Sequence, residues 1–136
     1  MAYPAYSVKY DKSNPTKMYS KAYKMIDKGQ YSKAQKILKN YTKSEPEDPD
    51  GWTLLAFTYR KLYKFAESEE YYLKALNLEP DNKSALEYQG ELFIETNRID
   101  LANANIKKLQ NLCPNSCEEL EKLQSYLLDQ SSKSNI

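Results

Sequence analysis

The sequence predicts an all-α protein built from three helix-turn-helix repeats and a C-terminal capping helix. An apolar pattern with helical spacing recurs every 34 residues, without insertion, from residue 15 to residue 116. Small residues recur at positions 8 and 20 of each unit, where two antiparallel helices approach closely only if the side chains are small. Pro46, Pro80 and Pro114 recur at position 32, where a proline ends the second helix. These three signals agree on one fold.

The chain ahead of the repeats, residues 1–14, has no helical period and carries Tyr3, Tyr6 and Tyr10. We expect a flexible N-terminal extension, and the alternative is a strap that lies over the first helices. Its sequence, MAYPAYSVKYDKSN, also lacks the apolar core of a signal peptide.

The repeats are expected at residues 15–48, 49–82 and 83–116. In each unit, apolar side chains of the first half follow the spacing i, i+4, i+7, and a turn separates them from a second helical stripe. Residues 117–129 repeat only the first-helix stripe, so we expect a helix that covers the last apolar face. Residues 130–136 are expected to form a disordered tail.

The second unit has the most distinctive pattern. Positions 4, 7, 8, 11, 24, 27 and 32 hold Trp52, Leu55, Ala56, Tyr59, Tyr72, Ala75 and Pro80. This spacing resembles the tetratricopeptide repeat (TPR), a helix-turn-helix module. The resemblance implies a right-handed superhelix whose activity is to hold another protein.

Composition excludes several classes of function. The formal net charge is +1, which gives no case for nucleic acid binding. The charge is unevenly divided, because residues 1–47 carry 10 Lys and 4 acids whereas residues 48–136 carry 10 Lys or Arg and 15 acids. No apolar run approaches the length of about 18 residues that a membrane span needs.

The residue types also argue against an enzyme. The sequence has no histidine, which removes the commonest general base and metal ligand and the usual catalytic triads. It has no GxGxxG or Walker motif, and acidic pairs such as Glu118/Glu119 are neighbours in the chain rather than facing groups. We therefore expect no catalytic residues, no metal site and no cofactor.

Cys113 and Cys117, in LCPNSCEEL, are the only cysteines, and they bracket the junction of two predicted helices. Three interpretations stay open: a disulfide, two free thiols, or a thiol pair for a soft metal or redox exchange. A disulfide closing so short a loop would stabilise the fold by about 2 kcal/mol in the chain-entropy model. A complete metal site is not expected within one chain that lacks histidine and a third cysteine.

The closing portion, from Ser84 to Leu120, resembles a group of short bacterial TPR proteins that end in a similar LCPxxCEE segment. Those proteins are commonly made with export signals. The resemblance implies a periplasmic location, where a disulfide persists, and the alternative location is the cytoplasm.

The TPR resemblance also assigns a partner-binding groove, because the first helix of each repeat lines a concave face. The groove residues are Tyr19, Tyr23, Thr53, Phe57, Arg60, Ser84, Glu87, Tyr88, Glu91 and Glu95. We expect the four aromatic residues of this set to anchor a partner, since exposed aromatic rings offer large contact area at little entropic cost. The charged residues Arg60, Glu87, Glu91 and Glu95 are expected to select it. The alternative is that the rings bury against neighbouring helices or under residues 1–14.

The same resemblance argues against one known mode of TPR binding, the capture of a chaperone C-terminus. TPR domains that capture chaperone C-termini hold the terminal carboxylate with a clamp of Lys, Asn and Arg side chains. The corresponding positions here hold Tyr19, Tyr23, Leu54, Ser84 and Tyr88, so the clamp is absent. An acidic, aromatic groove fits a basic or proline-containing segment, or a partner helix.

The sequence thus favours a non-enzymatic adaptor that binds a protein or peptide in its concave groove. Two alternatives remain: a scaffold that assembles with copies of itself through the groove or the N-terminal segment, and a thiol or metal role for Cys113 and Cys117.

Overall fold

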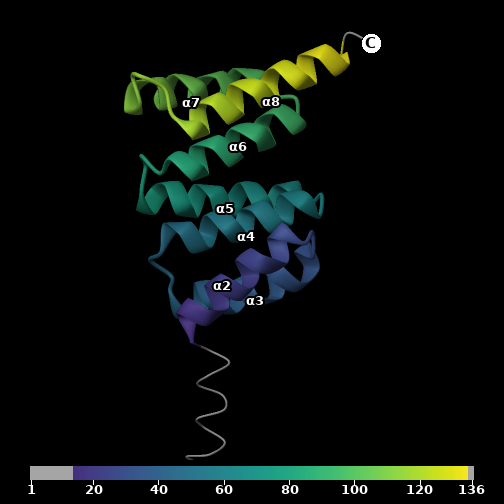
Figure 1. The fold of residues 1–136 in the computed structure, drawn as a ribbon, viewed down its shortest axis with the longest axis vertical. Coiled ribbons are helices and arrows are strands. Elements are labelled where there is room, and N and C mark those ends of the chain that lie inside the picture. The colour runs from purple at the N-terminus through teal and green to yellow at the C-terminus, as the bar shows by residue number, and fades with distance from the viewer. Residues whose placement is uncertain (1–13, 135–136) are drawn as a thin grey trace, which may run out of the picture.

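The computed structural model describes residues 14–134, which form seven α-helices and no strand (Figure 1). The helices are α2 (Pro15–Asp27), α3 (Tyr31–Ser44), α4 (Pro49–Lys61), α5 (Phe65–Leu78), α6 (Lys83–Glu95), α7 (Ile99–Leu112) and α8 (Glu118–Ser134). They stack along the long axis in chain order, with α2 and α3 at one end and α7 and α8 at the other (Figure 1). Residues 1–13, most of the predicted N-terminal extension, lie outside the described residues.

The first helix of each repeat begins at the first residue of its 34-residue unit, and one polar side chain sets each start. Asn14, Asp48 and Asn82 precede α2, α4 and α6, and their side-chain oxygens accept hydrogen bonds from the backbone N–H groups of Lys17, Asp50 and Ala85. Such caps satisfy backbone donors that have no partner inside the helix.

The turn inside each repeat uses one left-handed residue at position 15 of the unit. Gly29, Tyr63 and Asn97 have φ angles of 74°, 62° and 60°. The residue after each of them donates its N–H to a carbonyl five positions earlier, as in Lys64 N to Tyr59 O at 2.9 Å. This bond is characteristic of the Schellman motif that ends helices.

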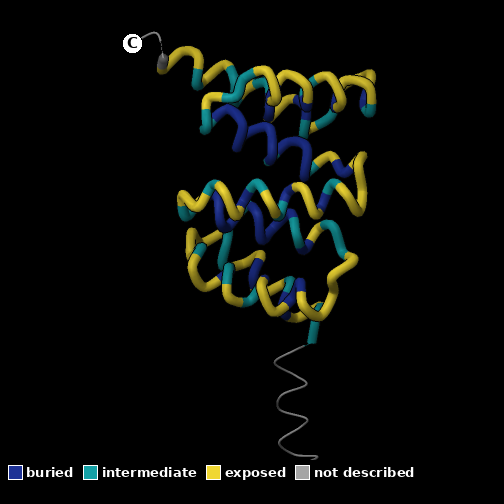
Figure 2. Tube along the Cα trace, turned by 180° about the vertical axis from the view of Figure 1, so that it is seen from behind, coloured by how far each residue is buried: buried dark blue, intermediate teal, exposed yellow. Residues whose placement is uncertain are grey.

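The helices form two layers. Helices α2, α4, α6 and α8 contact one another in turn, whereas α3, α5 and α7 each pack between their neighbours in the chain. Among the described residues, the helices of the second layer have no comparably close contact with one another, so the first layer forms the inner, concave side. Figure 2 shows that α6 is buried along most of its length.

Two glycines permit close approaches in the stack. A Cβ atom added to Gly51 would lie 2.6 Å from the Tyr41 ring, and one added to Gly90 would lie 2.6 Å from Leu123 Cδ2. Gly90 is at position 8, where the sequence predicts a crossing within its own repeat. The structure adds a reason, because Leu123 of the capping helix occupies the space that a side chain at Gly90 would need.

One predicted boundary is wrong. The capping helix was expected to end at residue 129 and to be followed by a disordered tail, but α8 continues to Ser134. Residues 130–134 contain no proline or glycine to stop the helix, so its hydrogen-bond ladder continues.

Candidate partner-binding groove

The predicted anchors lie on the concave side, and three rings form a continuous path. The Phe57 ring on α4 lies 5.0 Å from the Tyr88 ring on α6, measured between centroids, and 6.3 Å from the Tyr31 ring on α3. Both contacts are edge-to-face, a favourable arrangement for aromatic pairs. The path therefore joins one helix from each of the three repeats, namely α3, α4 and α6.

The aromatic residues differ in how much surface they leave free. Tyr23 is 51% exposed, whereas Tyr19, Phe57 and Tyr88 are half-buried. Burial, followed by the charges of Asp50 and Asp48, raises the pKa of Tyr19 to about 12. Burial, followed by Glu87 and Glu91, raises the pKa of Tyr88 to about 12. Both phenols are therefore neutral hydrogen-bonding groups at ordinary pH.

Arg60 is not an exposed selector, which corrects the sequence prediction. Its side chain is 1% exposed. The guanidinium Nη2 donates a hydrogen bond to Glu91 Oε1 at 2.7 Å, and Nη1 donates one to Glu95 Oε1. Position 12 of the second repeat faces the seam between α4 and α6 rather than open solvent. Burial acts to lower the Arg60 pKa, but Tyr72, Glu91 and Glu95 outweigh it and raise the pKa, so the guanidinium stays charged.

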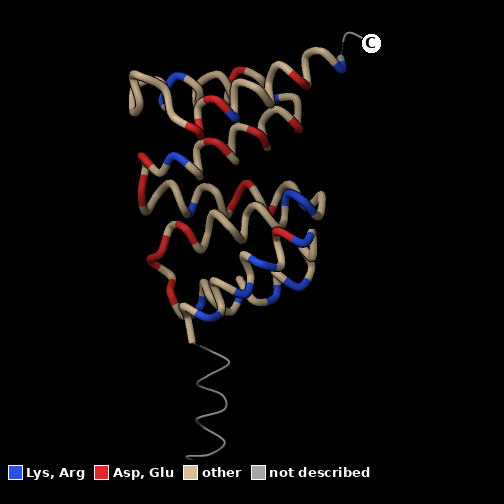
Figure 3. Tube along the Cα trace, viewed as in Figure 1, with Lys and Arg blue, Asp and Glu red and all other residues tan. Residues whose placement is uncertain are grey.

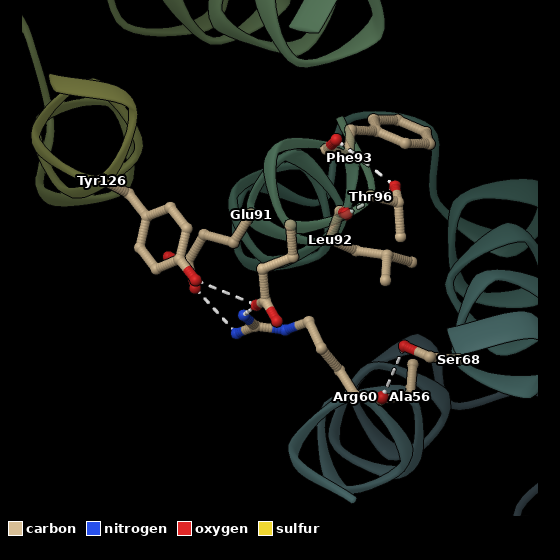
Figure 4. A network of polar contacts seen from close by, with 9 residues as sticks. Ala56, Arg60, Ser68, Glu91, Leu92, Phe93, Thr96 and Tyr126 are labelled. Atoms are coloured by element: carbon tan, nitrogen blue, oxygen red, sulfur yellow. Dashed lines mark hydrogen bonds and ion pairs between the residues drawn. The ribbon is translucent and has the colours of Figure 1, made fainter. Parts of the chain in front are cut away.

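The capping helix completes this polar network. Figure 4 shows Arg60 reaching from α4 toward Glu91 on α6, with Tyr126 approaching from α8. The Tyr126 hydroxyl donates to Glu95 Oε1 at 2.9 Å. The network thus ties together three helices of the concave layer, and its Glu91 is itself buried. Charge-assisted hydrogen bonds are stronger than neutral ones, and a buried network of them holds its side chains in fixed positions.

Thr53 is also unavailable to a partner, a second correction. Its side chain is buried, and its hydroxyl donates to the Pro49 carbonyl of its own helix at 2.8 Å. A threonine that bonds the carbonyl four residues earlier is satisfied locally. Ser84, in contrast, keeps some exposed surface and lines a cavity of about 320 Å³ at the α6 N-terminus.

Glu87 and Glu91 line a larger cavity of about 520 Å³ between α6 and α8. Its lining residues are Glu87, Glu91, Glu118, Glu121, Lys122, Ser125, Tyr126 and Asp129. Figure 3 shows that acidic segments gather on this part of the stack, whereas lysines gather on α2 and α3. We call this space the acidic cavity. Because Glu87 is 4% exposed and lines this cavity, the prediction that it is an exposed selector is wrong.

Glu87 has an unusual electrostatic environment. Burial is the largest cause of a rise in its pKa to about 8, followed by the hydrogen bond and charge of Glu91, while Lys122 opposes the rise. Two carboxyl groups side by side in a buried place do not ionise together, so Glu87 keeps its proton near neutral pH.

Sequence reasoning missed Tyr31, Lys122, Ser125, Tyr126 and Asp129 as residues of this face. Tyr31 is the first residue of α3, the second helix of its repeat, whereas the groove prediction took residues only from first helices. For α8, a signal was present, because residues 118, 121, 125 and 129 follow helical spacing and share one face.

A disulfide joins Cys113 and Cys117 at the junction of α7 and α8. Of the three interpretations that the sequence left open, this is the one the structure contains. The bond holds the start of α8 against the end of α7 and so constrains the helix that supplies one wall of the acidic cavity.

Among residues 14–134, no helix is long and apolar enough to cross a membrane. No group of three or more Asp, Glu, Cys or His side chains in the same range is arranged to hold a metal ion.

Comparison with known proteins identifies the fold. The family model of the tetratricopeptide repeat matches residues 49–82. The fold is a TPR superhelix. No curated protein sequence matches the chain.

Solved TPR structures superpose over most of the chain. The type III secretion translocator chaperone SycD of Yersinia enterocolitica, in an alternative dimer, has a TM-score of 0.76 at 16% identity, over 90% of this chain and 95% of that chain. The first TPR of Spaghetti (RPAP3), bound to the HSP90 peptide SRMEEVD, has a TM-score of 0.73 at 21% identity, over 86% and 93%. SycD bound to a peptide of the translocator YopD has a TM-score of 0.73 at 16% identity, over 88% and 93%. At these identities the likeness shows the fold alone.

Proposed function

We propose that the protein is a non-enzymatic interaction module that binds a segment of another protein along the concave face of its TPR superhelix. The observation that carries this proposal is the aromatic path of Tyr31, Phe57 and Tyr88, with Tyr23 half-exposed on α2 of the concave layer. Rigid aromatic rings at the centre of a concave surface are the usual anchors of protein interfaces.

The comparisons support this type of activity. Two similar TPR structures were determined with a peptide bound, one from HSP90 and one from YopD. The HSP90 peptide SRMEEVD carries three acidic residues, whereas carboxyl groups line the cavity between α6 and α8 of this chain. We therefore expect a partner segment of different charge, held without a carboxylate clamp.

The experiment compares three tagged proteins in a capture from a lysate of the source cell. Wild type is compared with the double variant Phe57→Glu/Tyr88→Glu and with Tyr63→Glu/Leu73→Glu, a matched control in which two exposed apolar side chains receive the same two charges. Mass spectrometry should find a protein retained by wild type and by the control but lost by the double variant. Circular dichroism establishes that the double variant is folded, and Phe57→Ala serves if it is not.

Direct binding then tests the captured protein. Calorimetry with the purified partner should give a Kd that the double variant weakens by at least about tenfold, as expected when two anchor rings are removed. Equal capture by wild type and a folded double variant would place binding elsewhere and reject the groove.

Self-assembly is the second candidate, and one observation favours it. A SycD structure similar to this chain is described as an alternative dimer, and Leu128 on α8 is an exposed apolar side chain of this chain. Light scattering over a range of protein concentrations distinguishes the two candidates, because an adaptor keeps the mass of one chain. A periplasmic location stays a prediction, which fractionation of the source cell would test.

A further inference from the structure

The acidic cavity combines a pocket with an excess of negative charge. It has a volume of about 520 Å³, within the range of sites that hold one ligand group. Five carboxyl groups line it, and the single cation among its lining residues is Lys122. The walls come from α6 and α8, so the cavity opens on the concave side at the C-terminal end of the groove.

The cations around the cavity are already paired. The Nζ atom of Lys122 lies 2.6 Å from Glu118 Oε1. Arg60, behind the cavity wall, bonds Glu91 and Glu95. Within residues 14–134, neither Glu87 nor Asp129 has a Lys or Arg nitrogen within ion-pair distance. The carboxyl groups that line the cavity therefore outnumber its cations, and the cavity has a net negative charge.

Glu87, one of these five carboxyl groups, is buried without a cation beside it. Its side chain is among the most buried polar groups of the protein, at 4% exposure, yet it lines the cavity. Its hydrogen-bond partner is another acid of the cavity, Glu91, and not a cation. Burying an ionised carboxyl group without a cation is costly, so the protonated form is favoured and the pKa of Glu87 is raised. A positive group entering the cavity would supply the missing partner.

The residues that line the cavity indicate which class of positive group it would bind. A long basic side chain carries an apolar stem and a charged head, and the ring of Tyr126 in the wall suits such a stem. A guanidinium bonds two carboxylates at once, which a single ammonium does less well. The lysines of α2 and α3 lie at the opposite end of the stack, so they do not reach the cavity of their own chain (Figure 3).

We propose that the acidic cavity binds an arginine or lysine side chain of the partner segment, with arginine preferred. Glu87, Glu121 and Asp129 receive the positive group, and Tyr126 packs against its stem. This inference rests on the proposed function, because it names the residue class that a segment in the groove must carry. The partner is thus a basic segment with an apolar or aromatic residue next to its basic one, since the aromatic path adjoins the cavity at Tyr88.

The test uses single amino-acid derivatives, so it does not depend on knowing the partner. ¹H–¹⁵N NMR spectra of the full chain are recorded during titration with N-acetyl-arginine amide and with N-acetyl-citrulline amide, its neutral isostere. We expect the arginine derivative to bind with a Kd of about 1–10 mM, reasonable for one side chain. The shifted amides should belong to α6 and α8, and the citrulline derivative should bind at least about tenfold more weakly.

Matched variants place the site. Glu121→Gln/Asp129→Asn should weaken arginine binding by about tenfold, because it removes two receiving charges. The control Glu67→Gln/Glu70→Gln removes the same charge from exposed positions on α5 and should leave the Kd unchanged. If both double variants weaken binding equally, the effect is the general field of the protein and the proposal is overturned.

The pH dependence provides a readout that needs no variant. Glu87 must lose its proton to pair with the ligand, a loss that burial, Glu91 and Glu119 oppose and that Lys122 favours. Arginine binding should therefore tighten as pH rises from about 6.5 to 9, and Glu87→Gln should flatten this trend. A Kd that is independent of pH in wild type contradicts the assignment of Glu87.

Three other results of the titration would reject the proposal. Equal binding of the arginine and citrulline derivatives, or shifts confined to the aromatic path, would reject the cavity as a basic-residue site. Such a failure leaves the groove itself to the capture experiment, which uses Phe57 and Tyr88 instead. Shifts of the same α6 and α8 amides with protein concentration alone would show that the occupant is a second copy of the chain, and would overturn the assignment to another protein.

Discussion

Arg60 on α4 and Glu91 on α6 form an ion pair, with 2.7 Å between Nη2 and Oε1, inside the concave layer of the superhelix. Because the Arg60 side chain is 1% exposed, the pair joins two repeats through the interior and not across the surface. This placement removes Arg60 from the set of groups that meet a partner and gives it a role in fixing the groove wall.

Removing Arg60 should strongly destabilise the fold. Arg60→Ala leaves Glu91 and Glu95 without their cation, and breaking a buried ion pair typically costs about 3–5 kcal/mol. The matched control is Arg98→Ala, which breaks a two-bond pair with Glu69 whose side chains are 35% and 36% exposed and should cost about 1 kcal/mol or less. Urea unfolding measures both losses. Similar losses for the two variants would mean that burial of Arg60 has no energetic consequence.

Stability should depend on pH through Glu87. The pKa of this group is about 8 in the folded chain against an ordinary value of 4.5, so the folded state holds a proton that the unfolded state has lost. The contribution of Glu87 is fully favourable below about pH 4.5 and is lost as pH rises toward and through 8. Glu87→Gln imitates the protonated acid, so we expect unchanged stability at low pH and higher stability than wild type above pH 8. Thermal unfolding across this range measures the difference, and parallel curves for the two proteins would contradict it.

The α6–α8 crossing should not tolerate a side chain at Gly90. Gly90→Ala places a methyl group 2.6 Å from the Leu123 side chain, and overpacking of this kind costs about 1–3 kcal/mol even though alanine favours helix. Leu123→Ala alone should cost about 2–5 kcal/mol, because it leaves a cavity in the core. The double variant should be more stable than the sum of the single changes predicts, which a double-mutant cycle by urea unfolding measures. Additive losses would mean that the two positions do not meet.

The turn of the second repeat should be improved by glycine. Tyr63 has a φ of 62° and its side chain is 79% exposed, so it bears the cost of a left-handed conformation with little burial in return. Tyr63→Gly should stabilise the fold by about 0.5–1 kcal/mol. The variant removes a left-handed penalty of about 1–2 kcal/mol, but it loses the ring contact with Phe65 and adds the conformational entropy of glycine to the unfolded chain. Differential scanning calorimetry should show a higher Tm. A lower Tm would mean that the Tyr63–Phe65 contact outweighs the backbone cost.

The sequence could place the aromatic rings on the inner helices, but it could not predict which charged groove residues are buried. Repeat spacing places Phe57 and Tyr88 on the inner helices, and the structure brings their rings to 5.0 Å. The same spacing treats Arg60 as equivalent to an exposed position, because it describes one helix face at a time. Whether a face is open depends on how closely the next helix approaches, and this distance is a property of the stack.

The sequence by itself determined the helices, their limits and their repeat. Local signals suffice for these features: a capping Asn or Asp before each first helix, a turn between the two apolar stripes of each unit, and a proline after each second helix. Such signals act over a few residues and need no distant partner. Only the absence of a stop signal in α8 was misread, at residues 130–134.

Only the tertiary structure decided which carboxyl groups face solvent, which pair with Arg60 and which line the acidic cavity. Glu87, Glu91 and Glu95 follow one another at four-residue intervals and look alike in the sequence. In the stack they have different partners, because α8 covers part of α6 and Arg60 reaches in from α4. Burial and charge are long-range properties, since both depend on residues about 30 positions apart that meet only when the repeats pack.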